Sequence, residues 1–259
     1  MKSSSVMSSF TLASMLAMMC LSSNALAKST KSKQPAPNPA QASVQGAPLT
    51  AETWEFRIRE EDSIFSIVTL KKGIASGLAH NHLIAATRYQ AQLKANPKEL
   101  EKGTFTFSTK VSDLEVDRAD LQKRWFPTIK SLSWLTEPFS ELKDSDRETI
   151  REHMLASDQL NAKNFPEISA KIVDIAASES QVGGKKYAQK ANVAVTILGK
   201  TVARPFSANI ALNGEELSVE AAGGFSFSDF GITPYSTMFG ALGNQDKFHM
   251  LVSMRAVKK

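Results

Sequence analysis

Cysteine is almost absent from this sequence. The 259 residues include a single cysteine, at position 20. One cysteine cannot form an intramolecular disulfide, so the fold must be stabilised by a packed core, which a chain of this length can build. The sequence also has no Gly-x-Ser-x-Gly nucleophile elbow and no glycine-rich phosphate loop. Because these common signatures of catalysis are missing, we expect a binding protein rather than an enzyme.

The sequence also lacks a dense basic cluster interleaved with aromatic residues, the pattern that nucleic-acid-binding surfaces carry. Lys and Arg number 31 against 26 acidic residues, which gives a net charge of +5, but they are scattered along the chain. The sequence therefore predicts no nucleic-acid partner. Because a mildly positive protein is attracted to anionic lipid head groups, transient contact with a membrane surface is a further prediction.

No apolar run near the N-terminus is long enough to be a permanent membrane anchor. Phe10 to Leu21 is apolar but too short to span a bilayer, and the small-x-small pattern Ala25-Leu26-Ala27 follows it. We therefore predict that residues 1–27 are a secretory signal peptide, cleaved near Ala27, and that the protein is periplasmic or secreted. A lipoprotein signal using Cys20 is the alternative, but the bulky Met18 and Met19 before it disfavour this.

The next segment, residues 28–50, is rich in Lys, Pro, Ala, Gln and Ser and has almost no large apolar side chains. Such a segment buries too little apolar surface to offset the entropy of ordering, so we predict a flexible linker. The folded domain is expected to occupy residues 51–259.

Alternation of apolar and polar residues dominates this domain. Gly103 to Val111 alternates strictly, with Phe105 and Phe107 on one face, as expected for a strand with one dry side. The dipeptides Gly183-Gly184 and Asn213-Gly214 are hairpin signals between further alternating runs. The pattern predicts eight or nine antiparallel strands arranged as a barrel or a sandwich.

A helical insertion is expected between residues 118 and 160, where the two-residue period is lost. Asp144 to Leu155 has an acidic start and apolar residues at helical spacing, and Ser145 with Glu148 matches a capping box. A second short helix is expected from Arg118 to Leu135, broken near Pro127.

Two of the four histidines lie two residues apart, in the apolar stretch Gly77 to Ile84. In a strand, residues i and i+2 share a face, so His80 and His82 would project into one space. His153, from the helical insertion, would supply a third ligand to a metal such as zinc. Three interpretations stay open: a metal site, polar contacts at the mouth of a ligand pocket, or ordinary structural hydrogen bonds.

Three carboxylates alternate near the end of a predicted strand: Asp113, Glu115 and Asp117. Paired carboxylates perform acid–base chemistry in some enzymes. Three on one face beside a loop are more often a solvated rim, and this is the interpretation we favour. The alternative is that they join the histidines as metal ligands.

Four short motifs follow one another in the second half of the chain: Arg151-Glu152-His153-Met154-Leu155, Phe165-Pro166-Glu167-Ile168, Thr196-Ile197-Leu198-Gly199-Lys200-Thr201 and Ser228-Asp229-Phe230-Gly231-Ile232. In this order they resemble the YceI-like, polyisoprenoid-binding family over about residues 52–258, and the Gly-x-x-His-Asn-His pattern of residues 77–82 resembles one branch of it. The resemblance implies a lipocalin-like, antiparallel eight-stranded β-barrel with a short helical lid. It also implies a periplasmic protein that binds an isoprenoid or similar amphiphile in an apolar tunnel.

The residues expected to line that tunnel are aromatic or β-branched and face inward in the predicted strands. They are Phe105, Phe107, Val193, Val195, Phe206, Phe225, Phe227 and Phe248, joined by His80 and His82 at the mouth. The simpler alternative is that these side chains fill the barrel as a solid core. Two functions are therefore carried forward: a lipid-binding barrel without a cofactor, and a metal-binding protein or metal-dependent enzyme that uses His80, His82 and His153.

Overall fold

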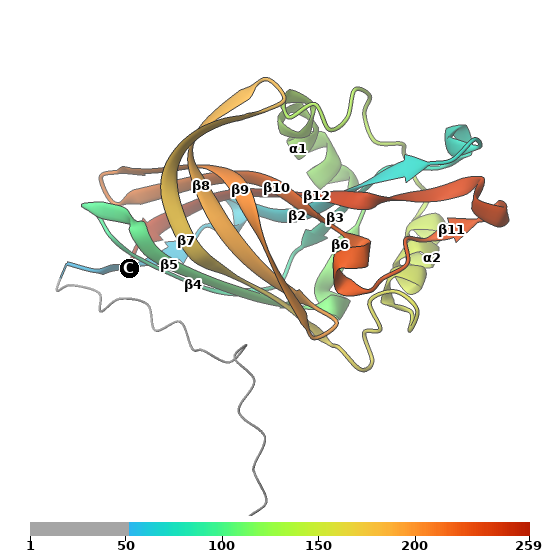
Figure 1. Ribbon diagram of the computed structural model, residues 1–259, viewed down its shortest axis with the longest axis horizontal. Helices are drawn as coiled ribbons and strands as arrows, with labels where there is room; N and C mark the ends of the chain where they lie inside the picture. The colour runs from blue at the N-terminus through green and yellow to red at the C-terminus, as the bar shows by residue number, and fades with distance from the viewer. Residues whose placement is uncertain (1–51) are drawn as a thin grey trace, which may run out of the picture. The chain divides into compact units, whose positions relative to one another are not determined.

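Eight strands form a closed antiparallel ring in the computed structural model, which describes residues 52–259 (Figure 1). In ring order they are β1 (Trp54–Ile58), β4 (Gln90–Asn96), β5 (Glu99–Lys110), β7 (Glu167–Val182), β8 (Lys185–Ile197), β9 (Lys200–Asn213), β10 (Glu216–Ser226) and β12 (Leu242–Lys258). Pairing of Arg57 with Val257 joins β1 to β12 and closes the ring. The all-β class and the ring of eight antiparallel strands are as predicted, whereas the expected signal peptide and the whole of the expected linker lie outside the described residues.

Three further strands extend the sheet from β12, beyond the eight strands of the ring. The strands β2 (Ile64–Lys72), β3 (His82–Ala86) and β6 (Leu114–Val116) pair in the order β12–β2–β3–β6. Each follows or precedes a ring strand in the sequence, so β1 and β2, β3 and β4, and β5 and β6 are interrupted long strands. The interruption between β3 and β4 lies at residues 87–89.

The hairpin turns form where glycine permits them. Gly214 has a positive φ of 62° between β9 and β10, as predicted for Asn213-Gly214. Gly183 has a φ of 57° between β7 and β8, and a Cβ there would lie 2.4 Å from the carbonyl carbon of Leu132. Only glycine fits this turn, because both the backbone angle and the neighbouring chain exclude a side chain.

The two helices cover different parts of the ring. Helix α1 (Ala119–Ser131) packs on the outer face, where Trp125 and Ile129 are buried against Val68 of β2 and Leu83 of β3. The predicted break at Pro127 is wrong: the helix continues through the proline, and Trp125 and Ile129 are buried on either side of it.

Helix α2 (Asp144–Leu155) lies at the end where β6 is not paired with β7 (Figure 1). It begins after Lys143 without a side-chain cap, so the predicted capping box of Ser145 and Glu148 is wrong. The short strand β11 (Ser236–Thr237) pairs with the start of β12 near the same end. Within residues 52–259, no helix is long and apolar enough to cross a membrane.

Candidate functional site

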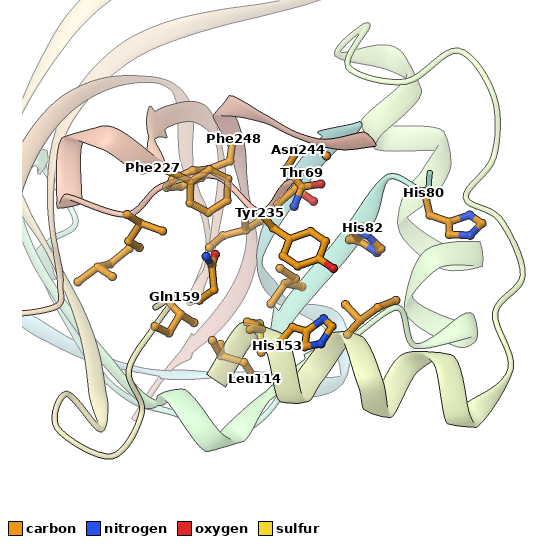
Figure 2. A pocket seen from close by; sticks show the side chains of 18 of the residues that line it. Thr69, His80, His82, Leu114, His153, Gln159, Phe227, Tyr235, Asn244 and Phe248 are labelled. Atoms are coloured by element: carbon orange, nitrogen blue, oxygen red, sulfur yellow. The ribbon is translucent and has the colours of Figure 1, made fainter. Parts of the chain in front are cut away.

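A cavity of about 240 Å³ opens at the end of the ring that α2 covers (Figure 2). We call it the mouth cavity. Its walls come from β2, β3, β6, β7, β8 and β12, from α2 and the segment after it, and from the segment between β10 and β11. Representative lining residues are Ile67, Ile84, Leu114, Met154, Ile232 and Leu242. No Lys, Arg, Asp or Glu is among the lining residues, so no permanently charged side chain lines this cavity.

A second cavity of about 120 Å³ lies inside the ring, and we call it the interior cavity. Five of the residues predicted to contact a ligand line it: Phe105, Phe107, Val193, Val195 and Phe206. Phe227, Phe248, His80 and His82 line the mouth cavity instead. The predicted residues are therefore divided between two spaces that share Ile168 in their walls.

Phe225 lines neither cavity, which corrects its predicted role as a ligand contact. Its side chain is 2% exposed and packs against Phe206 at 5.8 Å and Phe248 at 6.1 Å between ring centroids. Since Phe206 belongs to the interior cavity and Phe248 to the mouth cavity, Phe225 lies between their walls. At Phe225 the alternative prediction, that the inward-facing side chains fill the barrel as a solid core, describes the structure.

His82 is held in a fixed orientation by Asp117. Its Nδ1 atom donates a hydrogen bond to Oδ2 of Asp117 over 2.6 Å, and the Asp117 side chain is only 1% exposed. The same carboxylate accepts hydrogen bonds from the backbone N–H of Leu83 and from Gln122 Nε2, both at 2.8 Å. This arrangement leaves Nε2 of His82 free to interact with a molecule in the mouth cavity.

The expectation that Asp113, Glu115 and Asp117 form a solvated rim is therefore wrong for Asp117. Its buried carboxylate needs several donors, and it has them because β3 pairs with β6 and Asp117 directly follows β6. The backbone of Asp117 has a positive φ of 52°, a conformation that Asp tolerates better than most residues. By contrast, Glu115 forms an ion pair with Arg118, and both side chains are more than 40% exposed.

Thr69 is a polar residue of the site that no sequence pattern indicates. It lies directly opposite His82 in the pairing of β2 with β3, and it lines the mouth cavity. The residue is 2% exposed, and its Oγ1 has no hydrogen-bond partner within the described chain. A buried hydroxyl without a partner costs about 1–3 kcal/mol, so this atom is a natural contact for a bound molecule.

The remaining histidines occupy different surroundings. The ring of His153 on α2 stacks on Tyr235 with centroids 5.4 Å apart, so α2 and the segment before β11 meet over the cavity. Figure 2 shows His82, Tyr235 and His153 around one end of the cavity, with His82 between His153 and His80 in this view. His249 lies apart from the cavity lining and stacks on Trp134 at 4.5 Å.

The three histidines do not assemble into a metal site. His80 and His82 both line the mouth cavity, with ring centroids 6.5 Å apart, although β3 begins only at His82 and His80 precedes it. Among residues 52–259, no group of three or more His, Cys, Asp or Glu side chains is arranged to hold a metal ion. The trio of His80, His82 and His153 is thus a set of cavity-lining residues.

Comparisons with known proteins agree with this fold. No curated protein matches the sequence significantly. The structure is similar to that of BcnA from Burkholderia cenocepacia, with a TM-score of 0.51 at 16% identity, covering 78% of this chain and 100% of that one. A polyisoprenoid-binding domain from Saccharophagus degradans has a TM-score of 0.47 at 6% identity, over 79% of this chain and 98% of that one. The YceI protein of Campylobacter jejuni has a TM-score of 0.44 at 16% identity, over 68% and 84%.

The family of the chain is shown by its sequence. The model of the YceI-like domain family matches residues 76–254, which includes every strand from β3 to β11 and both helices. The match begins just before His80 and ends within β12, so it also includes the mouth cavity apart from the residues contributed by β2. The chain belongs to the YceI-like domain family.

Proposed function

We propose that this protein is exported and binds one lipid-like amphiphile in the mouth cavity, without chemical transformation of the ligand. The observation that carries the proposal is the cavity itself: an apolar space at the end of the ring, enclosed by α2 and provided with a few polar groups, most of them near His82 and Tyr235. Small-molecule sites generally have this combination of an apolar wall and few, well-placed polar atoms.

The polar end of the ligand is assigned to the group around His82. Thr69 Oγ1 and His82 Nε2 belong to directly paired residues of β2 and β3, and Tyr235 and His153 lie across from them (Figure 2). Together they offer hydroxyl and imidazole groups but no permanent charge. A hydroxyl or carbonyl head group satisfies them, whereas a phosphate or diphosphate would be buried without a cationic partner, which is costly.

The volume limits how much of the ligand is enclosed. Ligand pockets usually measure about 300–1,000 Å³, and the mouth cavity lies just below that range. The interior cavity offers further apolar space, but Phe225, packed between Phe206 and Phe248, separates it from the mouth cavity. We therefore propose that a short amphiphile, or the head and first part of a longer one, occupies the mouth cavity.

Helix α2 is the natural lid for entry and release. None of its residues is fully buried, and besides the partly buried Met154 and Leu155 it is fixed to the ring by contacts at its surface. Among them are the stacking of His153 on Tyr235 and a hydrogen bond of 2.8 Å from Arg151 to the carbonyl of Ser112. Segments with so little buried surface open at low free-energy cost.

Native mass spectrometry of the protein purified after export, combined with elemental analysis, tests the proposal. We expect one bound amphiphile per chain and no stoichiometric metal. Zinc or copper bound at one equivalent, and lost in a His80→Ala, His82→Ala variant, would instead support a metal-binding function.

A paired titration of the ligand-free protein tests the head group. Geranylgeraniol and geranylgeranyl diphosphate share one hydrocarbon chain and differ only in the charge of the head. We expect the alcohol to bind at least about tenfold more tightly, a difference of about 1.4 kcal/mol. Equal binding, or tighter binding of the diphosphate, would refute an uncharged head-group site.

A further inference from the structure

We propose that two loops beside the mouth cavity form a membrane-docking tip, which inserts Ile74, Met238 and Phe239 into an anionic lipid bilayer. Ile74 belongs to the loop between β2 and β3, and Met238 and Phe239 belong to the turn between β11 and β12. We call these three residues the apolar tip. Docking itself does not depend on the proposed function, although the consequence for ligand transfer does.

The apolar tip is unusually exposed. Ile74 is 99% exposed, Met238 is 58% exposed and Phe239 is 112% exposed. The other exposed large hydrophobic residues of the described chain, such as Phe165 and Val173, are only 38% and 42% exposed. Single exposed apolar residues are normal on protein surfaces, but fully exposed ones that gather at one place mark a binding surface.

The two loops are fastened to one another, so their apolar side chains act as one unit. Lys72 pairs with Gly243 across β2 and β12, and the N–H of Ala75 donates to the carbonyl of Ala241 over 2.9 Å. Gly73 has a φ of 103°, and a Cβ there would lie 2.3 Å from the carbonyl oxygen of Ala241. Figure 1 shows both loops projecting from the end of the ring where α2 lies.

The backbone of the tip is strained in a way that its own contacts do not explain. Met238 and Phe239 are consecutive non-glycine residues with positive φ angles of 51° and 55°. Each such conformation costs about 1–2 kcal/mol. The strain turns the Phe239 ring fully into solvent, where it gains nothing in the isolated protein. A bilayer would bury that ring and so compensate for the strain.

The charge near the tip fits an anionic surface. Lys71 and Lys72 end β2, Gly73 separates them from Ile74, and Lys72 is exposed. The carboxylate of Asp246 also interacts with Lys72, but it is occupied by hydrogen bonds from the N–H and hydroxyl of Ser228, at 2.9 and 2.6 Å. A basic residue close to an anionic membrane contributes about 1 kcal/mol to binding.

The tip adjoins the mouth cavity on both sides. Tyr235 precedes β11, Leu242 and Gly243 begin β12, and all three line the cavity. Ala79, at the other end of the β2–β3 loop, lines it too. A docked tip would therefore place the cavity opening at the bilayer surface, where an amphiphile can enter without crossing water.

Flotation with vesicles of phosphatidylcholine and phosphatidylglycerol tests the proposal on the exported protein. We expect the protein to float with these vesicles, and an Ile74→Ser, Phe239→Ser double variant to bind at least about tenfold more weakly. A matched control, Phe165→Ser with Val173→Ser, removes exposed apolar side chains away from the tip and should bind as the wild type does. Since Ile74 and Phe239 are fully exposed, the double variant should keep the wild-type melting temperature, whereas the control replaces side chains that are more than half buried and should melt somewhat lower.

A Phe239→Trp variant gives a second readout, because the emission of an inserted tryptophan shifts to shorter wavelength when vesicles are added. Wild-type protein that does not float, a double variant that floats equally well, or an unshifted emission would overturn the proposal. The proposal would also be overturned if the wild type were a dimer and the double variant a monomer, because the tip would then be a self-association surface. If the double variant retains the ligand that co-purifies with the wild type, docking and ligand binding are separate properties. Loss of that ligand would count against the proposed function and not against docking.

Discussion

Replacing Thr69 with valine is expected to make the ligand-free protein more stable and ligand binding weaker. The hydroxyl of Thr69 is buried, has no partner within the described chain, and faces the mouth cavity. Valine has nearly the same shape and carries no polar atom, so the variant avoids a desolvation cost of about 1–3 kcal/mol. We expect a gain of about 1 kcal/mol in the free energy of unfolding, which raises the melting temperature by about 2–4 °C.

Binding should change in the opposite direction. Loss of one neutral hydrogen bond to the ligand costs about 0.5–1.5 kcal/mol, so the Kd for geranylgeraniol should rise about two- to tenfold. Thr109→Val is the matched control, because Thr109 is 4% exposed but its hydroxyl donates to the carbonyl of Arg88 over 2.7 Å and lines neither cavity. This control should lose about 1 kcal/mol of stability and bind normally. Equal destabilisation by both variants, with unchanged binding, would refute our account of Thr69.

Three further predictions concern the surroundings of the cavity. Asp117→Asn removes the charged acceptor of His82 Nδ1, which should lower the free energy of unfolding by about 1.5–3 kcal/mol in chemical denaturation and weaken alcohol binding; unchanged stability would contradict the role of the buried carboxylate. Phe225→Ala should cost about 3–5 kcal/mol but join the two cavities, so longer-chain alcohols should gain affinity relative to short ones in titration; an unchanged preference for chain length would show that Phe225 does not separate them. Burial, followed by the charge of Lys247, lowers the pKa of His249 to about 4, so the unfolded state binds a proton more readily and the free energy of unfolding of the wild type should fall by on the order of 2 kcal/mol from pH 6.5 to 4. His249→Phe should lose correspondingly less over that window, and equal losses in the two proteins would contradict the shift.

The repeating strands could be predicted from the sequence because their signals are local. The alternation in Gly103 to Val111 and the turn at Asn213-Gly214 each depend on a few neighbouring residues, and both are confirmed. A helix in the region of Pro127 could be predicted, but its continuity through the proline could not. Its stability comes from Trp125 and Ile129, which are buried against strands far away in the sequence.

The candidate site was predictable only in part for the same reason. His80 and His82 attract attention because histidines are few and their spacing is short. Asp117 and Thr69 carry no such signal, since their roles arise from the pairing of β3 with β6 and with β2. The sequence therefore reveals which imidazoles face the cavity, whereas their partners follow from contacts between distant segments.

Occupation of the mouth cavity by the amphiphile is the central claim, and photolabelling measures it most directly. A long-chain alcohol that carries a diazirine on its chain would be irradiated with the ligand-free protein, and the labelled peptides would be identified by mass spectrometry. We expect labels on Ile84 of β3, Met154 of α2 and their neighbours in the cavity wall, and we expect unlabelled geranylgeraniol to suppress them. Labels confined to the outer surface of the ring, or labels that the competitor leaves unchanged, would contradict the claim.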